Sequence, residues 1–574
     1  MAMRIRHIKG FNGGVAGGLA AHPSERVMYY VVGSSVLAVF EGDPTKQVQL
    51  RGHDDELTAF AMSPRGTFLA TGQRGANSDV VIWDARGLAQ KHRFQEHNFE
   101  VCALAFSSDE RLLATVGNER ERRVFVLDTA TGKIVSNTTL LEPKARRRTR
   151  ALAWSPACGP CYVFASAADM DLYLYTLDPF KGWVNCEKVV TGSVRKAVHA
   201  LCFSADGAWL FAGTASGDVL SINVARRAVQ VRQGAPAAAA RRRRTTPRDA
   251  ERAALRVRGR SQVMHQVASA GVSALLLAPD GRRLLVGALD SSLSLFDPRG
   301  EGPHTAPPLA AVPGAIVALS AAAGGGLLVG TQQGDISLVP AAGGRVAPVL
   351  QSQRGALRDL VWAPCGGSLA TASASGTVCV WDAATLGLEC RAALHNTDAA
   401  AQSVALSPDG ALLVSGWSDG DIHCHGRGGA QGGAGGAPGA PARPAPGAAA
   451  HAPGAALWCI PQAHATAHSA GVPALQVSHR GHFIASGGAG GEVRVWDVAS
   501  RELVSHLKHH VMPITDLKVS VVSVGLDRAV SVWDLRCDAA VRVVQDAHQH
   551  EITCVAVNHA GTLIATGGAD CAVF

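Results

Sequence analysis

The sequence predicts an all-β protein made of two tandem β-propellers, on the basis of three observations. A short apolar run closed by Trp-Asp returns along the chain, at residues 80–84, 378–382, 493–497 and 530–534. An alternating apolar run with a Ser-Pro-x-Gly turn precedes this motif, as in residues 57–72. Together the two runs recur about every 40–45 residues, which is the length of one four-stranded propeller blade.

Strand–turn–strand cores can be placed in order along the chain. Short runs that alternate apolar and polar residues and are bounded by Gly, Pro, Ser or Asp are typical of half-buried strands joined by tight turns. Propellers usually have about four to eight blades, so the number of cores requires two rings. The twelve cores begin near Val15, Leu57, Val101, Arg150, Val198, Val272, Ile316, Leu357, Ser403, Val472, Ile514 and Ile552.

The two propellers are predicted at residues 1–345 and 346–574. We expect both to be seven-bladed, the first closing around the core at 316–339 and the second being incomplete in this chain. An arginine-rich insertion at 234–262 and a Gly/Ala/Pro-rich insertion at 426–455 interrupt the repeats. Both are expected to be disordered loops, because such sequences bury too little apolar surface to offset the entropy of ordering.

Two places in the second propeller depart from the repeat pattern. No turn separates the strands expected in residues 514–524, so we expect a skipped turn or a skipped repeat there. The chain stops at Phe574, midway through a third strand, so we expect a longer natural protein and an open sheet edge. The blades that contain Trp496 and Trp533 are still predicted to form.

The Gly-His and Trp-Asp pairs are interpreted as residues of the fold. A Trp at the end of the third strand offers a large apolar body that can pack between neighbouring blades. The predicted structural signature comprises Gly52, His53, Trp83, Asp84, Trp381, Asp382, Trp496, Asp497, Asp527, Trp533 and Asp534.

Composition and charge exclude several classes of protein. No stretch reaches 18 apolar residues, which argues against a membrane-spanning helix, and no apolar segment follows Arg6, so we expect no secretory signal. The 13 cysteines form no spaced framework, as expected for a reduced, intracellular chain. Basic clusters, including residues 144–150, explain much of the net charge of +8. Such runs could contact nucleic acid, acidic tails or phosphates, but we expect solvated loops. Because no aromatic residues interleave the arginines, nucleic-acid binding is not expected.

Two short motifs suggest redox or metal chemistry. Cys158-x-x-Cys161 resembles the motif of thioredoxin-like oxidoreductases, which needs a helix after the first cysteine. Here the following sequence is β-rich, so a hairpin turn is predicted instead. In a strand, Cys424 would point away from His423 and His425, so no shared metal ion is expected.

An enzyme would need a converging set of acid, base or nucleophilic groups, or metal ligands. The candidates are His509 with His510, His548 with His550, and Asp54 with Asp55. All of them lie at the starts of repeats, where the Gly-His pattern already accounts for them. We therefore expect no catalytic activity and no cofactor, and a binding platform is the leading class.

Four segments carry a resemblance to a known family: the opening Gly10-Phe11-Asn12-Gly13, and residues 327–336, 414–422 and 487–496. They resemble the cilia- and flagella-associated protein 52 family of WD40-repeat proteins, and the repeat order corresponds over essentially the whole chain. The resemblance implies two consecutive seven-bladed propellers. It also implies a non-catalytic protein of the motile axoneme that binds tubulin and other inner proteins in the lumen of doublet microtubules and stabilises them.

Two alternatives remain open. Centriolar or basal-body WD-repeat proteins share a similar opening, and a generic cytoplasmic adaptor would have the same fold. The two insertions are not part of the family pattern, so no partner surface is assigned to them.

Overall fold

The chain divides into two compact units, Met1–Ser352 and Gln353–Phe574. The helices and strands assigned among the described residues are all β-strands. None of these residues forms a helix able to cross a membrane. The computed structural model describes residues 8, 10–15, 17–40, 43–121, 123–139, 148–157, 159, 161–191, 194–229, 231–232, 261–262, 264–278, 280–298, 308–322, 326–340, 346–353, 356–364, 366–383, 385, 387–393, 399–426, 456–460, 471–518, 522–534, 539–558 and 562–574.

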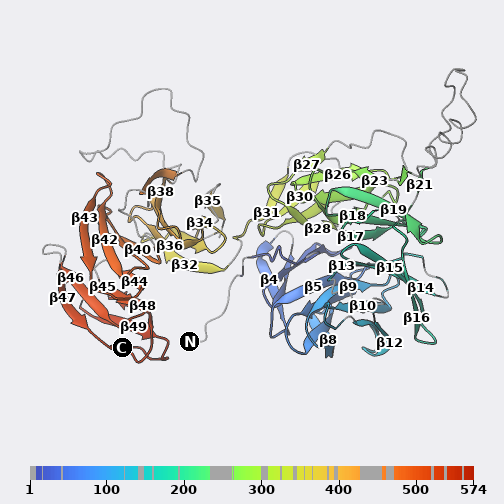
Figure 1. Ribbon diagram of the computed structural model, residues 1–574, viewed down its shortest axis with the longest axis horizontal. Helices are drawn as coiled ribbons and strands as arrows, with labels where there is room; N and C mark the ends of the chain where they lie inside the picture. Colours follow the sequence, from blue (N-terminus) through green and yellow to red (C-terminus); the bar gives the residue numbers. More distant parts are fainter. Residues whose placement is uncertain are drawn as a thin grey trace, which may run out of the picture. The chain divides into compact units, whose positions relative to one another are not determined.

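The described part of the first unit contains seven antiparallel sheets of four or five strands and one two-stranded pair (Figure 1). Its first four sheets are β1 (Leu19–Ala21), β2 (Val27–Val32), β3 (Ser35–Phe40) and β4 (Asp43–Arg51); β5 (Leu57–Met62), β6 (Phe68–Gln73), β7 (Ser78–Asp84) and β8 (Ala89–His97); β9 (Val101–Phe106), β10 (Leu112–Gly117), β11 (Arg123–Asp128) and β12 (Ile134–Thr139); and β13 (Thr149–Trp154), β14 (Tyr162–Ala168), β15 (Asp171–Asp178) and β16 (Trp183–Lys188).

The remaining sheets of this unit include the strand pair at the base of the arginine-rich insertion. They are β17 (Val198–Phe203), β18 (Trp209–Thr214), β19 (Asp218–Asn223) and β20 (Ala228–Val229) with β23 (Met264–Gln266); the pair β21 (Val231–Arg232) and β22 (Ser261–Gln262); β24 (Val272–Leu277), β25 (Leu284–Ala288), β26 (Ser292–Phe296) and β27 (Pro308–Ala311); and β28 (Ile316–Ala321), β29 (Gly326–Thr331), β30 (Ile336–Pro340) and β31 (Ala347–Leu350).

Each sheet of the first unit packs between two neighbours, which explains why both faces are apolar. In β10, for example, every residue is buried. One hydrophobic cluster lies between each pair of consecutive sheets. A further cluster joins the seventh sheet to the first and includes Leu328 and Tyr30. The Ala21 amide also donates to Ser320 Oγ at 2.8 Å, so β1 is tied to β28 by hydrogen bonding as well as packing.

The described part of the second unit contains four four-stranded sheets and one two-stranded sheet. They are β32 (Leu357–Trp362), β33 (Ser368–Ser373), β34 (Thr377–Asp382) and β35 (Leu388–Ala393); β36 (Ala401–Leu406), β37 (Leu412–Trp417), β38 (Ile422–Gly426) and β39 (Ala456–Ile460); β40 (Ala474–Val477), β41 (Phe483–Gly487), β42 (Glu492–Asp497) and β43 (Leu503–Lys508); β44 (Ile514–Lys518), β45 (Val522–Gly525), β46 (Val530–Asp534) and β47 (Ala539–Val544); and β48 (Ile552–Val557) with β49 (Ile564–Gly568).

Four hydrophobic clusters join these five sheets in sequence order. The first sheet differs from the three that follow it because its innermost strand is largely exposed. On β32, Leu357, Leu360 and Trp362 are 55%, 49% and 55% exposed. By contrast, the equivalent strand of the next sheet, β36, is buried at all but one residue.

The all-β fold class with tandem propellers is confirmed by the antiparallel four-stranded sheets, which occur at the predicted cores. The sheets that contain Trp496 and Trp533 are formed. Two complete seven-bladed rings and the boundary at residue 345 stay predictions. Residues 234–260 and 427–455 of the two insertions lie outside the described residues. Residues 519–521, between β44 and β45, also lie outside the described residues. The two strands pair with Lys518 opposite Val522. The skipped turn therefore stays a prediction.

Candidate functional site

In the second sheet, the predicted signature residues meet at a hydroxyl group on β6. His53 Nε2 lies 2.6 Å from Thr71 Oγ1, and Trp83 Nε1 donates to the same oxygen at 2.9 Å. The other ring nitrogen, His53 Nδ1, lies 2.7 Å from Gln73 Oε1. Burial lowers the pKa of His53, so the neutral ring is favoured in the fold. The group links the loop before β5 to strands β6 and β7 through one hydrogen-bonded chain.

The second unit repeats the arrangement with a carboxylate in place of Gln73. His510 Nδ1 lies 2.9 Å from Asp527 Oδ1, and its Nε2 lies 2.8 Å from Ser523 Oγ. Trp533 Nε1 donates to Ser523 Oγ at 2.8 Å. His510 and Ser523 are both buried, so neither side chain is exposed to a substrate in solution, and both are used in the packing of the sheet. His509, beside it in the sequence, is exposed.

The other candidate histidine pair behaves in the same way. His548 is buried, with Nδ1 at 3.0 Å from Asp570 Oδ1 and Nε2 at 2.9 Å from Thr566 Oγ1. His550 is exposed, as are Asp54 and Asp55. The residues considered for catalysis therefore divide into buried groups used by the fold and exposed groups that do not converge with them.

In three of the Trp-Asp pairs the aspartate stabilises a turn. Asp84 Oδ1 accepts from the Arg86 amide at 3.1 Å. Asp382 Oδ1 accepts from the Thr385 amide at 2.7 Å. Asp497 Oδ1 accepts from the amides of Ala499 and Ser500 at 2.9 and 2.7 Å, and these hydrogen bonds, the one from Ser500 first, lower the pKa of the carboxyl group. The side chain of Asp534 lies outside the described residues.

Sequence reasoning missed the hydroxyl residues that connect to the tryptophans. Trp381 donates to Thr371, Trp496 to Ser486 and Trp533 to Ser523, each partner lying ten residues earlier in the chain. The ten-residue spacing in these three sheets was a usable signal, whereas the Thr71 partner of Trp83 lies 12 residues earlier.

The structure describes the candidate metal motif in full and the candidate redox motif only in part. Cys158 lies outside the described residues, and Cys161 is exposed directly before β14, so the hairpin-turn interpretation stays a prediction. Cys424 is fully buried in the cluster between the second and third sheets of its unit. The rings of His423 and His425 stack on each other with centroids 6.3 Å apart. No group of three or more metal-ligating side chains occurs among the described residues.

A feature absent from the sequence analysis is a β-bulge near the start of the innermost strands. In β5, β13 and β17, for example, the pairing register skips one residue: Thr58, Arg150 and His199 respectively. Bulges re-aim the side chain of the extra residue. The bulge residues of the first unit line one cavity of ≈ 250 Å³; they are Thr58, Cys102, Arg150, His199, Ser273 and Val317.

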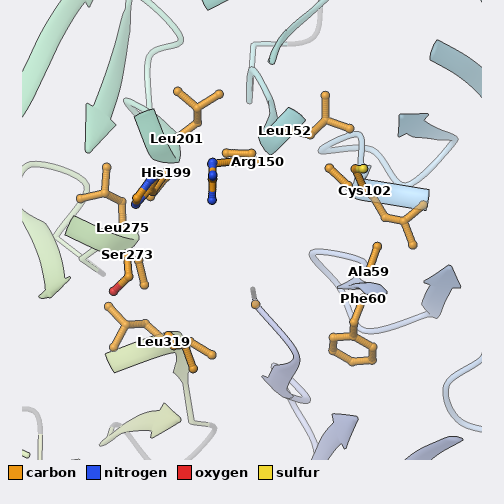
Figure 2. Close-up of a pocket in the computed structure, with 18 residues that line it drawn as sticks. Ala59, Phe60, Cys102, Arg150, Leu152, His199, Leu201, Ser273, Leu275 and Leu319 are labelled. Carbon is orange, nitrogen blue, oxygen red and sulfur yellow. The ribbon is translucent and has the colours of Figure 1, made fainter. Parts of the chain in front are cut away.

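This cavity is the mouth of a channel between the innermost strands. A deeper cavity of ≈ 210 Å³ shares Arg150 and His199 with the mouth and continues to leucines of five strands. Figure 2 shows the Arg150 side chain reaching from its strand into the opening beside His199. We call the larger outer cavity the channel mouth; its described lining residues are Gly13, Gly14, Thr58, Cys102, Arg148, Thr149, Arg150, His199, Ser273, Val317 and Gln332.

The channel mouth is lined by basic groups. Arg150 Nε lies 3.2 Å from Asp169 Oδ1, and Arg148 pairs with Glu100. Burial and, after it, Arg150 lower the pKa of His199, which favours the neutral ring. Burial also raises the pKa of Cys102 to about 12, so this thiol is not a nucleophile near neutral pH.

The fold and these sites can be compared with known proteins. The WD domain, G-beta repeat family matches residues 44–84, 88–123, 184–220, 345–382, 389–425, 460–497 and 541–574. Cilia- and flagella-associated protein 52 of Chlamydomonas reinhardtii is 25% identical over 603 residues, covering 99% of this chain and 89% of that protein. The Homo sapiens protein of the same name is 24% identical over 552 residues, covering 93% of this chain and 77% of its own length.

A shorter similarity involves a different protein. WD repeat-containing protein 90 of Mus musculus is 32% identical over 146 residues, which is 25% of this chain and 8% of that protein. The similarity over nearly the whole chain confirms the resemblance expected from the opening and the repeat motifs.

Proposed function

We propose that this chain, which carries WD40 repeats and is similar along nearly its whole length to cilia- and flagella-associated protein 52, is a non-catalytic scaffold of the ciliary or flagellar axoneme. The observation that carries this proposal is the similarity to the Chlamydomonas protein, which covers 99% of this chain. A match confined to some repeats would indicate only the fold, because propellers serve many functions. A match that preserves the repeat order across both units supports a shared role.

The architecture suits a scaffold. The sheets of each unit are held by hydrophobic clusters between consecutive blades. Such packing gives a rigid body with wide rims and varied loops, on which several partners can bind at once. The buried histidines considered for catalysis are engaged in the fold, which favours a binding role over an enzymatic one.

More specifically, we propose that the partners include tubulin and other axonemal proteins, and that the chain binds in the lumen of doublet microtubules and stabilises them. The sequence resemblance to the family supports this placement. A protein enclosed by the microtubule wall should resist extraction with high salt, because enclosed contacts are screened less than exposed ones and the wall blocks escape.

The test is fractionation of cilia from cells that express the tagged chain. We expect the tag to stay with axonemes after detergent and after high salt, and its loss to leave axonemes assembled but mechanically fragile. A tag found only in the cytosol or nucleus would contradict the proposal. A signal confined to basal bodies would instead favour the centriolar alternative.

A further inference from the structure

The channel mouth of the first unit has the chemistry of an anion-binding site. Its ionisable lining groups are Arg148, Arg150, His199 and Cys102, and no carboxylate is among its described lining residues. Glu100 and Asp169 pair with the two arginines from outside this lining. A concave surface lined by one sign of charge concentrates the opposite charge.

The two ion pairs orient the arginines and leave their outer ends accessible. The Arg148 side chain is 52% exposed while that of Glu100 is 19% exposed. The corresponding values are 47% for Arg150 and 31% for Asp169. A guanidinium group has five N–H donors, so one carboxylate does not use all of them. The remaining donors can bind a second carboxylate at the mouth.

One buried hydroxyl group in the lining of the channel mouth has no hydrogen-bond partner among the described residues. Thr149 is 2% exposed and lines the channel mouth, and its Oγ1 makes no hydrogen bond among the described residues. Buried hydroxyl groups normally have a partner. Thr58 and Ser273, by contrast, donate to the backbone of the next sheet, at Val101 O and Ile316 O.

The deeper part of the channel limits how far an anion can enter. It adds leucines of several strands to the lining, among them Leu152, Leu201, Leu275 and Leu319 (Figure 2). A side-chain carboxylate that enters from outside reaches the arginines first, and the leucines beyond them offer it no hydrogen-bond donor, so it would stay at the channel mouth. The mouth, at ≈ 250 Å³, is small for a ligand pocket and suits a side chain or chain segment.

We propose that the channel mouth binds a carboxylate side chain of an acidic peptide segment in a partner protein, with Arg150 and Arg148 as the charged contacts. The inference rests on the proposed scaffold function only in requiring a protein partner. The partner class it adds is a protein with an exposed Glu-rich segment. The location of the chain in the cell does not enter the argument.

The structure supplies a matched control for Arg150. Arg282 Nε lies 3.2 Å from Asp297 Oδ2, the same separation as in the Arg150–Asp169 pair. Arg282 is 72% exposed and is not part of the channel mouth. Replacing either arginine by Gln removes one charge and one ion pair, so a difference between the two variants reports the site itself.

The experiment measures binding of a fluorescent peptide of alternating Glu and Ala to the full chain by anisotropy. We expect Arg150→Gln to weaken binding about tenfold or more, as for loss of a charge-assisted hydrogen bond, and Arg282→Gln to change it less than about twofold. A peptide with Gln in place of Glu should bind at least about tenfold more weakly. Arg150→Lys keeps the charge but loses the planar donor pair, so it should fall between Arg150→Gln and the wild type.

Three results would overturn the proposal. Equal weakening in Arg150→Gln and Arg282→Gln would mean non-specific attraction. Equal binding of the Glu and Gln peptides would exclude a carboxylate ligand. Displacement of the peptide by inorganic phosphate as effectively as by unlabelled peptide would assign the site to small anions. If Arg150→Gln fails to fold by circular dichroism, Arg150→Lys decides, and wild-type affinity in that variant counts against the site. If the peptide-binding results contradict the site but the tagged chain still stays with axonemes, only the peptide proposal is wrong and the scaffold proposal is unaffected.

Discussion

Trp83 and Asp84 are adjacent in the sequence but stabilise different parts of the blade. The Trp83 ring packs in the cluster between the first two sheets and donates to Thr71. The Asp84 carboxylate holds the turn that follows β7 by accepting from the Arg86 amide. Alternation along a strand sends neighbouring side chains to opposite faces, which explains the division. We propose that the predicted signature residues are structural throughout.

Gly52, which follows β4, is required by the tryptophan of the next sheet. A Cβ atom at Gly52 would lie 2.7 Å from Trp83 Cη2. We expect Gly52→Ala to lower the free energy of unfolding by about 1–3 kcal/mol, because the rigid ring has to shift within a packed interface. Urea denaturation measures this. Gly159→Ala is the control, since its nearest contact would be 3.8 Å, and an equal loss in both variants would contradict the explanation.

His510 and His509 form a natural pair for testing the buried hydrogen-bonded chain. His510→Ala should lower the free energy of unfolding by about 1–3 kcal/mol, because Ser523 and Asp527 lose their partner. The exposed His509→Ala should change it by less than about 0.5 kcal/mol. Thermal denaturation distinguishes the two variants. Similar melting temperatures would show that the hydrogen bonds of His510 contribute little to the stability of the fold.

The lowered pKa of His53 predicts the direction of a pH effect. The folded state holds the ring neutral, so between its lowered pKa and the unfolded value of about 6.5 the unfolded state binds more protons. The free energy of unfolding should therefore fall as the pH is lowered through about 6.5. Urea midpoints at about pH 7.5 and 5.5 measure this, with His53→Gln expected to show a smaller difference. A larger difference in the variant would contradict the sign.

At the scale of the elements, a β-bulge recurs near the start of the innermost strands, and the residues found at it are of two kinds. Where it holds Thr or Ser, the hydroxyl group can bond to the next sheet, as from Thr515 to Ile552 O at 2.7 Å. Where it holds Arg150 or His199, an ionisable side chain lines the channel mouth, which Thr58 and Ser273 also line. The same backbone irregularity therefore contributes to packing as well as to the lining of the channel, depending on the residue it carries.

The exposed strand β32 predicts self-association. Leu360 and Trp362 are about half exposed, and exposed apolar surface on a strand favours intermolecular contact. We expect Trp362→Arg to reduce concentration-dependent light scattering of the purified chain several-fold. Val511→Arg, at an 88% exposed loop residue, should have little effect. An equal reduction of light scattering in both variants would indicate that the added positive charge, and not the loss of the exposed Trp362, is the cause.

At the scale of the molecule, each described hydrophobic cluster lies wholly within one of the two units. Separate cores favour separate cooperative unfolding. We therefore retain, as a proposal, the two predicted folding domains, residues 1–345 and 346–574, with the boundary itself placed after β31, because Leu350 packs in a cluster of the first unit.

Differential scanning calorimetry tests this domain assignment. We expect two transitions, with Gly52→Ala shifting only one of them and His510→Ala only the other. The cluster that joins the first and seventh sheets of the first unit supports the higher transition being that of the first unit. A single transition that both variants shift equally would contradict independent domains.

The sequence by itself determined the blades, because a blade is local: its strands follow one another and their alternation and turns are visible in about 40 consecutive residues. It also indicated that His53 and Trp83 belong to the fold. It did not reveal the channel mouth. There Arg150 and His199 lie 49 residues apart in the chain, and Arg150 came from a basic cluster interpreted as a solvated loop, of which residues 144–147 lie outside the described residues. Only the stacking of sheets brings the inner strands together, and only the bulge turns their side chains into one opening, so no periodicity along the chain could predict it.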